Sequence, residues 1–210
     1  MLPLAEDTDE LLRRAEAGNR EAISDLLDRH RERLRRMVAV RIDPRLSARV
    51  DPSDVLQESL AEAARQLPRY LKERPLPFYP WLRQLTWTRL VKLHQRHIKV
   101  QKRTVRREIG EELPLSDHSA LRLAEQLVAA DASPSEVLLH KEMRQRVRDA
   151  LHHMTARDRE VLVLWYLEQL TAGEIALILN LTEAGVKSRH RRALQRLIGN
   201  LSHDRGATDD

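Results

Sequence analysis

Hydrophobic residues along this chain recur at the spacing of amphipathic helices. In two stretches the apolar positions fall three or four residues apart, which places their side chains on one helical face. These positions are Leu56, Leu60, Ala63 and Leu67 in the first stretch and Ile175, Ile178 and Leu179 in the second. Alternating runs of β-branched residues are missing, and Leu, Arg, Glu and Ala dominate, which favours helix. The pattern predicts an all-α protein.

Capping signals predict where four helices begin. Side chains of Ser, Thr, Asp and Asn accept hydrogen bonds from the first N–H groups of a helix. Segments that start with such a residue and carry an acid three positions later span residues 51–54, 133–136, 155–158 and 171–174. In the first two segments, Pro52 and Pro134 occupy the first helical position, where a missing N–H is tolerated. We expect a helix to follow each cap.

The helical pattern weakens in the middle of the chain. Between Ile98 and Ser133 a basic stretch, KVQKRTVRREIG, is followed by EELPLSDHS and by a weak helical segment, ALRLAEQLVAA. Such a change is typical of a segment between domains. We predict two small helical domains, residues 10–98 and 134–202, joined by a linker at 99–133, and we expect the terminal SHDRGATDD to fray.

Residues 174–197 predict two helices joined by a tight turn. Asn180 tolerates the left-handed conformation that ends a helix, and Thr182 can cap the next one. The second helix has an apolar side formed by Val186, Ala193, Leu194 and Leu197, and an opposite side with Ala184, Ser188, Arg191, Arg192 and Gln195. This pattern is typical of a helix-turn-helix, whose second helix enters the DNA major groove.

The second helix is strongly basic, with no acid between Glu183 and Asp204. We predict that base edges are contacted by Lys187, Ser188 and Arg191, and phosphates by Arg189, Arg192 and Arg196. Phosphate contacts position the protein, whereas base contacts specify the sequence. A solvated basic face on an ordinary helical hairpin is the alternative. His190 falls near the apolar side, where we expect a partly buried residue.

Composition narrows the class of protein. Lys and Arg outnumber Asp and Glu by 37 to 32, with a formal net charge of +5 and a pI near 9.9, which favours an anionic partner. The absence of cysteine excludes disulfides, thiolate catalysis and cysteine zinc sites. From the first residues, MLPLAEDTDE, we expect no signal peptide, and the longest apolar run, Val161 to Leu167, is too short to span a membrane. We expect a cytoplasmic protein.

Residues 77–98 concentrate aromatic and basic side chains. Pro77 and Pro80 predict a stiff loop at residues 78–79, followed by a helix from about Trp81. We expect Trp81 in the core. Trp87 points away from the helix's apolar side, beside Arg83, and an exposed aromatic beside cations suits single-stranded DNA. A core role for Trp87 stays open.

The stretch DPSDVLQESLAEAARQL places an acidic face opposite its apolar stripe. The outward residues are Asp54, Gln57, Glu58 and Glu62. An acidic face repels DNA, so this face suits either water or a protein partner.

Two matching regions resemble the extracytoplasmic-function sigma factors of bacterial RNA polymerase. The sequence MTARDREVLVLWYLEQLTAGEIALILNLTEAGVKSRHRRALQRL is similar to their C-terminal domain, through RDREVLVL, EIA and VKSRHRRAL. DVLQES followed by WLRQL is similar to their N-terminal domain. The resemblance covers residues 20–98 and 134–200, and its specificity lies in the occurrence of both domains in this order.

The resemblance implies a role for each region. The C-terminal domain would bind the −35 promoter element, and Asp54, Gln57 and Glu58 would dock on the clamp helices of the polymerase β′ subunit. The helix after Pro80 and the loop before it would open the −10 element and capture unpaired bases, with strand contacts from Arg83, Trp87, Arg89 and Arg96. Thr88 stands where the family usually has asparagine, which leaves the base contacts there open.

The expected function is therefore that of a sigma factor, which recognises −10 and −35 elements and promotes transcription initiation without chemistry, cofactor or metal of its own. The polymerase core supplies catalysis, and the basic segment from Lys99 to Arg107 would follow the nucleic-acid path. Family members are commonly held inactive by an anti-sigma partner, although no residue here identifies one.

Two other classes remain as alternatives. A stand-alone helix-turn-helix transcriptional regulator would need a sensory N-terminal domain, typically with strands. A metal-dependent nuclease would need convergent carboxylates or histidines. His94 and His97 lie three residues apart but lack a third ligand in the sequence nearby, and the adjacent His152 and His153 diverge.

Overall fold

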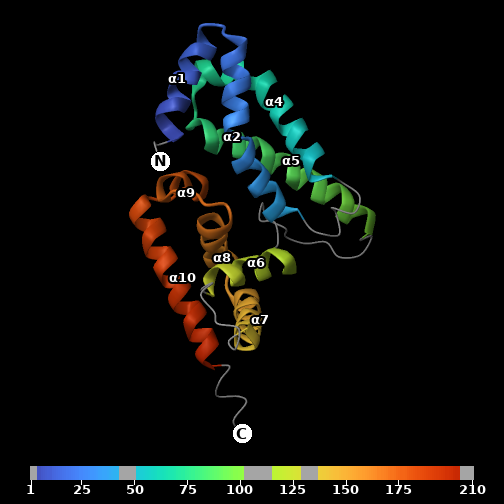
Figure 1. Cartoon of the computed structure of the whole chain (residues 1–210), viewed down its shortest axis with the longest axis vertical. Helices are drawn as coiled ribbons and strands as arrows, with labels where there is room; N and C mark the ends of the chain where they lie inside the picture. The colour runs from blue at the N-terminus through green and yellow to red at the C-terminus, as the bar shows by residue number, and fades with distance from the viewer. Residues whose placement is uncertain (1–3, 43–50, 102–114, 129–136, 204–210) are drawn as a thin grey trace. The chain divides into compact units, whose positions relative to one another are not determined.

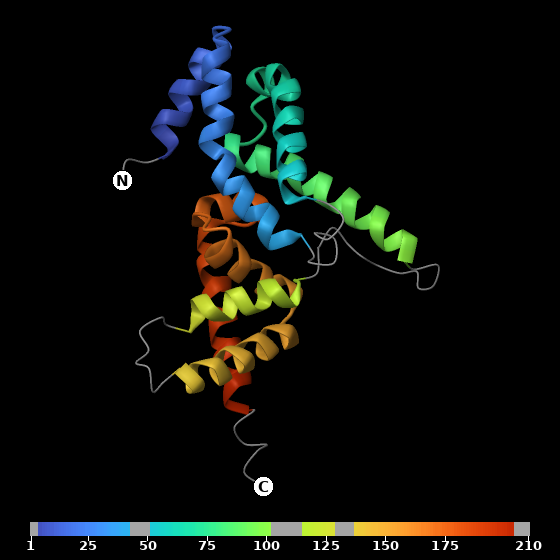
Figure 2. The same cartoon turned by 45° about the vertical axis from the view of Figure 1, so that its right-hand side comes forward.

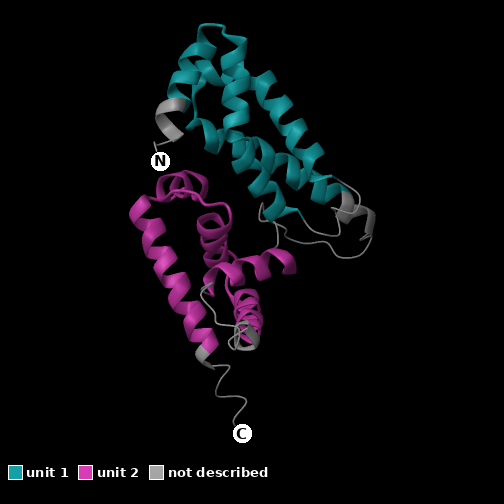
Figure 3. Ribbon diagram, viewed as in Figure 1, with its two compact units in different colours: residues 1–111 teal, residues 112–210 magenta. Residues whose placement is uncertain are grey.

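The computed structural model describes residues 4–42, 51–101, 115–128 and 137–203, and this described part is built from helices with no strand (Figure 1). The chain divides into two compact units, residues 1–111 and 112–210 (Figure 3). The predicted all-α fold is confirmed. No helix within these ranges is both long and apolar enough to cross a membrane.

Unit 1 contains α1 (Leu4–Glu16), α2 (Arg20–Arg41), α4 (Pro52–Glu73) and α5 (Phe78–Gln101). Helix α2 packs against the other three helices, and α4 packs against α5 (Figure 1). The predicted apolar stripe of α4 is confirmed, because Leu56, Leu60, Ala63 and Leu67 are all buried. Burying this stripe leaves the opposite, acidic side of α4 at the surface.

Unit 2 contains α6 (Asp117–Leu127), α7 (Val137–His153), α8 (Ala156–Leu162), a π-helical turn η2 (Val163–Leu167), α9 (Ala172–Leu179) and α10 (Glu183–His203). Helix α10 packs against α7, α8 and α9. Helix α6 lies alongside α7 and also contacts η2 (Figure 2). The last helix is thus held by three elements of its own unit.

Helix α6 falls inside the segment for which the sequence predicts a linker. Ser116 caps this helix by accepting a hydrogen bond from the N–H of Ser119 at 3.2 Å. Ala120, Leu123 and Ala124 are 0% exposed, so α6 belongs to the core of unit 2. The two units change over between Glu111 and Glu112. The predicted domain boundaries stay a prediction.

Three of the four predicted helix starts are confirmed. Asp51, Thr155 and Thr171 accept hydrogen bonds from the N–H groups of Ser53, Asp158 and Glu174, respectively. The fourth start, at residues 133–136, lies outside the described residues. So do residues 102–107 of the basic segment and the end of the chain from residue 204.

The predicted loop before Trp81 is wrong, because α5 begins at Phe78. Pro80 lies in the first helical turn, where proline removes no intrahelical hydrogen bond. The N–H of Trp81 already donates to the carbonyl of Pro77 at 3.1 Å. Phe78 and Tyr79 are each 3% exposed, so their burial in the core favours helix at these positions.

An aromatic cluster forms this part of the unit 1 core. Tyr70 stacks on Trp81 with ring centroids 4.3 Å apart and meets Phe78 edge-on at 5.5 Å. The hydroxyl of Tyr70 donates to the carbonyl of Leu76 at 3.0 Å. The expectation that Trp81 is a core residue is confirmed, since it is 7% exposed. The cluster ties the end of α4 to the start of α5.

His30 joins this cluster from α2. Its ring stacks on Tyr79 at 5.7 Å, and its Nε2 lies 3.2 Å from the Thr8 hydroxyl. Burial lowers the pKa of His30 to about 4 by penalising the charged form, and the charges of Arg33 and Arg29 lower it further. His30 is therefore a neutral core residue near pH 7.

Candidate nucleic-acid interface

The C-terminal hairpin consists of α9, a tight turn and α10. A capping box starts α9: the N–H of Glu174 donates to the Thr171 hydroxyl at 3.2 Å, and the N–H of Thr171 donates to the Glu174 carboxylate at 2.9 Å. Asn180 ends α9 in the left-handed conformation, with φ 51°. The N–H of Gly185 donates to the Thr182 hydroxyl at 3.0 Å. The predicted turn and caps are confirmed, and the pair is a helix-turn-helix.

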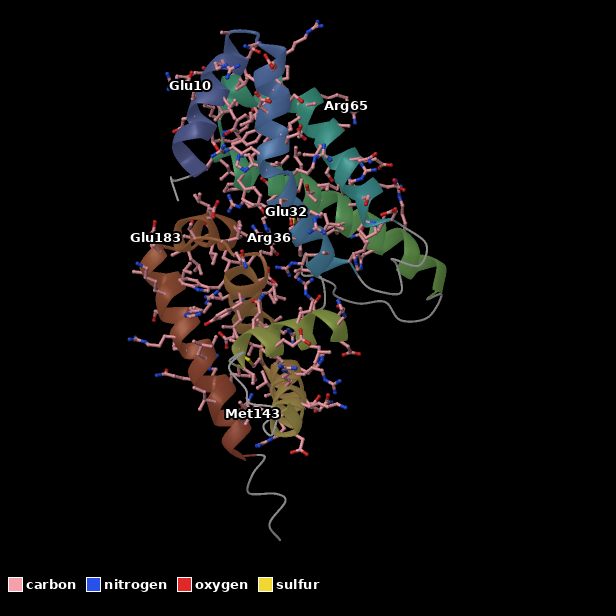
Figure 4. All side chains as sticks on the ribbon, in the orientation of Figure 1. Glu10, Glu32, Arg36, Arg65, Met143 and Glu183 are labelled. Carbon is pink, nitrogen blue, oxygen red and sulfur yellow. The ribbon has the colours of Figure 1, made fainter. Side chains whose placement is uncertain are left out.

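Helix α10 has a buried side and an exposed, basic side. Val186, Ala193 and Leu197 are 0%, 0% and 4% exposed. Nitrogen-tipped side chains project from the outer side of the helix, with Glu183 at its N-terminal end (Figure 4). Six DNA contacts were predicted on this helix. Four of them are exposed, namely Lys187, Arg191, Arg192 and Arg196, and two are half-buried, namely Ser188 and Arg189. One helix therefore holds all six residues.

The cations of α10 differ in their partners. Among the described residues, no acid pairs with Lys187, Arg189 or Arg191. The Nε of Arg192 donates to the carbonyl of Ser188 at 3.4 Å. Only Arg196, of these five cations, forms an ion pair within the described part, with Asp158 of α8. The N-terminal half of α10 thus carries positive charge that this chain does not compensate locally.

His190 supports α10 on the π-helical turn. Its ring stacks on Trp165 with centroids 4.4 Å apart and tilts against Tyr166 at 5.6 Å. Burial lowers the pKa of His190, which favours the neutral ring. The expectation that His190 is a partly buried residue is confirmed.

The predicted polymerase-binding residues share the outer side of α4. Asp54, Gln57 and Glu58 are exposed, as expected from the apolar stripe opposite them. Glu58 forms an ion pair with Arg89 of α5, and the two side chains are 56% and 37% exposed. The pair joins a predicted polymerase contact to a predicted DNA contact.

Trp87 of α5 lies near two arginines. The guanidinium carbons of Arg41 and Arg83 are 5.2 Å and 5.5 Å from the centroid of its ring, within the range of cation–π attraction. Arg83 is only 4% exposed, and Trp87 is half-buried. Arg41 was not among the predicted site residues, although it follows Leu34, Met37 and Val38 on the buried face of α2. Arg83 presents little surface to a DNA strand.

The other residues of α5 singled out from the sequence differ in exposure. Arg96 is exposed and Arg89 is half-buried. The Thr88 hydroxyl donates to the carbonyl of Gln84 at 3.0 Å, within its own helix. His94 is 5% exposed, and the side chain of His97 lies outside the described residues. Within the described part of the chain, no group of three or more His, Cys, Asp or Glu side chains is placed to hold a metal.

Fold and site together define a class: a two-unit helical protein whose C-terminal unit carries a helix-turn-helix with a basic second helix. Comparison with known proteins sharpens this class. Residues 144–197 match the family described as "Sigma-70, region 4". The match runs from within α7 through α8, η2 and α9 to most of α10.

Two similar proteins cover different shares of this chain. The RNA polymerase sigma factor FliA of Yersinia enterocolitica is 38% identical over 74 residues, 35% of this chain and 32% of that protein. The ECF RNA polymerase sigma factor SigD of Mycobacterium tuberculosis (strain ATCC 25618 / H37Rv) is 27% identical over 192 residues, 91% of this chain and 82% of that protein. This chain thus spans about a third of FliA but most of SigD.

The fold recurs in a solved structure of CnrH in complex with the cytosolic domain of CnrY. The TM-score is 0.54 at 21% sequence identity, over 94% of this chain and 99% of the other. At that identity the likeness concerns the fold alone. The region 4 match and the similarity to SigD along most of its length support an extracytoplasmic-function sigma factor.

Proposed function

We propose that this chain binds bacterial RNA polymerase core through α4 and recognises promoter DNA through α5 and α10. The observation that carries the proposal is the two-sided α10, with Val186, Ala193 and Leu197 buried and uncompensated cations outside. A helix-turn-helix uses the N-terminal half of such a helix in the major groove. The polymerase core supplies catalysis and metal, and this chain supplies binding.

Within the −35 contact, Lys187, Ser188 and Arg191 meet base edges. Arg191 is exposed on the side opposite the core, where an arginine can donate two hydrogen bonds to a guanine. Arg189 and Arg192 flank this side and contact phosphates, which set the register.

Within the −10 contact, α5 binds the unpaired strand. Trp87 offers part of its ring for stacking on a base, while Arg89 and Arg96 neutralise the backbone. The buried Arg83 and Arg41 contact the indole and help to hold it in place. Because these groups bind single strand better than duplex, they shift the equilibrium toward melted DNA.

The acidic side of α4 is the polymerase contact. Asp54, Gln57 and Glu58 are exposed, and an acidic patch complements a basic protein surface, here the β′ clamp helices. Joining this contact to two DNA contacts on one scaffold raises the effective concentration of each. The combination explains how weak DNA contacts act together on a promoter.

A second protein partner and the location belong to the same proposal. CnrH was solved with the cytosolic domain of CnrY, which supports an anti-sigma partner for this chain. A cytoplasmic location follows from the need to meet polymerase and DNA.

The test is co-purification of the full chain with bacterial RNA polymerase core, followed by run-off transcription on a genomic promoter pool. Core binding together with new, sequence-selective transcripts is the expected result. Duplex binding without affinity for the core would leave a stand-alone regulator and refute the role of α4.

A further inference from the structure

One acidic residue of unit 2 is buried and yet paired with the basic helix. Asp158 lies in the first turn of α8 and is 6% exposed, and its N–H donates to the Thr155 hydroxyl at 3.3 Å. Its carboxylate Oδ2 accepts a hydrogen bond from Nη1 of Arg196, which lies 38 residues further along the chain on α10. This ion pair connects the start of α8 to the second half of α10.

The burial of Asp158 makes this ion pair matter more than a surface pair. A carboxylate removed from water is costly unless it is paired and hydrogen-bonded. The side chain of Asp158 is 9% exposed, whereas that of Arg196 is 59% exposed. Moving Arg196 toward a DNA phosphate would therefore leave a buried carboxylate without this partner.

The position of Arg196 on α10 also sets it apart from the predicted base contacts. At about 100° per residue, Arg196 lies on the same side of the helix as Arg189, at the edge of the buried stripe of Ala193 and Leu197. Arg196 is nine residues beyond Lys187, or about 13 Å along the axis. Recognition helices contact bases with their N-terminal half, so Arg196 lies past that region.

We propose that Arg196 is a positioning residue, whose ion pair with Asp158 fixes how α10 is seated on α8 instead of contacting a phosphate. The pair sets the direction in which Lys187, Ser188 and Arg191 point. The role in aiming these three residues rests on the proposed DNA-binding function. The ion pair itself does not.

The experiment compares full-length variants Arg196→Ala, Arg196→Lys, Asp158→Asn and the double variant Arg196→Ala/Asp158→Asn. Arg192→Ala is the matched control, because Arg192 lies on the same helix, is exposed and has no acidic partner in the described part of the chain. Calorimetry gives the Tm of unit 2. Binding to a short mixed-sequence DNA duplex across a range of KCl concentrations gives the salt dependence, and selection from a random duplex library gives the sequence preference.

If Arg196 positions α10, then Arg196→Ala and Asp158→Asn each lower the Tm by about 4 °C or more. The double variant should lower the Tm no more than the worse single variant does, because both changes remove the same interaction. Arg196→Lys should recover most of the Tm. Below the Tm, both single variants should select duplexes less stringently with an unchanged salt slope, whereas Arg192→Ala should reduce the slope by about 0.9 without moving the Tm.

Three results would overturn the positioning role. One is an unchanged Tm in Arg196→Ala, and another is a loss of about 0.9 in the salt slope for this variant. The third is a gain in duplex affinity in Asp158→Asn, which would mean that the carboxylate competes with phosphate for Arg196. A wild-type chain that binds no duplex, alone or with polymerase core, would refute the proposed function and the aiming role together, and the Tm comparison would then show the ion pair by itself.

Discussion

Helices α4 and α10 are nearly equal in length, 22 and 21 residues, yet they present opposite charges. Helix α4 carries Asp54, Glu58 and Glu62 along its first three turns, whereas α10 has five cations and no acid from Lys187 to Arg196. Each helix buries an apolar stripe in its own unit. The difference between the two helices therefore lies in the charge of their exposed surfaces.

The two helices also differ in how their charges are compensated. On α4, Glu62 pairs with Arg65, Glu73 with Arg69, and Glu58 with Arg89 of α5. On α10, Lys187, Arg189 and Arg191 have no acidic partner among the described residues. Uncompensated cations release counterions from DNA on binding, so binding by α10 should be the more sensitive to salt.

The largest expected effect comes from reversing the charge of α4. Replacing Asp54 and Gln57 with lysine should weaken binding to polymerase core by about 100-fold or more, because like charges then face each other. Binding is measured by titration of labelled core. Glu73→Lys, at the far end of α4, is the control and should retain affinity. Undiminished binding by the double variant would mean that α4 is not the polymerase contact.

On α10, two neighbouring arginines should separate sequence recognition from general affinity. Arg191→Ala should cost about 1 to 3 kcal/mol and relax the preference at one promoter position, because an arginine contacts a base edge there. Arg192→Ala should weaken all duplexes alike. Measured affinities for a panel of promoter variants distinguish the two. A uniform loss in Arg191→Ala would make that residue a phosphate contact.

Acid should lower the stability of unit 1 through His30, which is more buried than His190, the other histidine that stacks on an aromatic ring. The pKa of His30 is lowered from 6.5 to about 4, so between these values the unfolded chain binds more protons than the folded one. The stability that comes from keeping His30 neutral is therefore fully present above pH 6.5 and is lost as the pH falls toward 4. Between pH 7 and pH 5 the loss is about 2 kcal/mol.

The measurement is urea unfolding at both pH values, with His30→Gln for comparison. This variant cannot titrate, so its stability should fall less than that of the wild type between pH 7 and pH 5. Equal losses in both proteins would place the pH dependence elsewhere. Burial also lowers the pKa of His190 in unit 2, so His190→Gln serves as a matched variant for that unit.

The smallest effect is expected at the exposed pair between α4 and α5. Glu58→Gln should change the free energy of unfolding by less than about 1 kcal/mol, because exposed ion pairs are screened by water. Chemical denaturation gives the free energy of unfolding of Glu58→Gln and, for comparison, of Asp158→Asn, which replaces a buried carboxylate. Equal losses in the free energy of unfolding for the two variants would contradict the distinction between an exposed ion pair and a buried one.

Helices and caps could be predicted from the sequence because both depend on local spacing. The stripe on α4, the capping box at Thr171 and the left-handed Asn180 all follow from residues within a few positions of each other. The start of α5 was missed because Pro77 and Pro80 favour a loop locally. Tyr70, eight residues before Phe78, and His30, on another helix, hold these aromatics in the core instead.

Contacts between distant segments could not be predicted in the same way. The spacing places Arg83 beside Trp87, but nothing local shows that Arg83 is buried or that Arg41 of α2 reaches the same ring, because a charged residue on a helix is normally exposed. The pairing of Asp158 with Arg196 likewise joins residues 38 positions apart. The site residues of α4, α5 and α10 stay predictions until their partners are tested.

The separation of the two sides of α10 has a consequence for how such proteins diversify. Val186, Ala193 and Leu197 anchor the helix, while Ser188, Arg191 and Gln195 lie outside this anchor. Under the proposed function, substitutions at these outer positions alter the promoter that is chosen and leave the packing intact. A duplicated gene can then acquire a new promoter specificity without a loss of stability that further mutations must restore. The same outer positions are the ones to randomise when orthogonal transcription circuits are built.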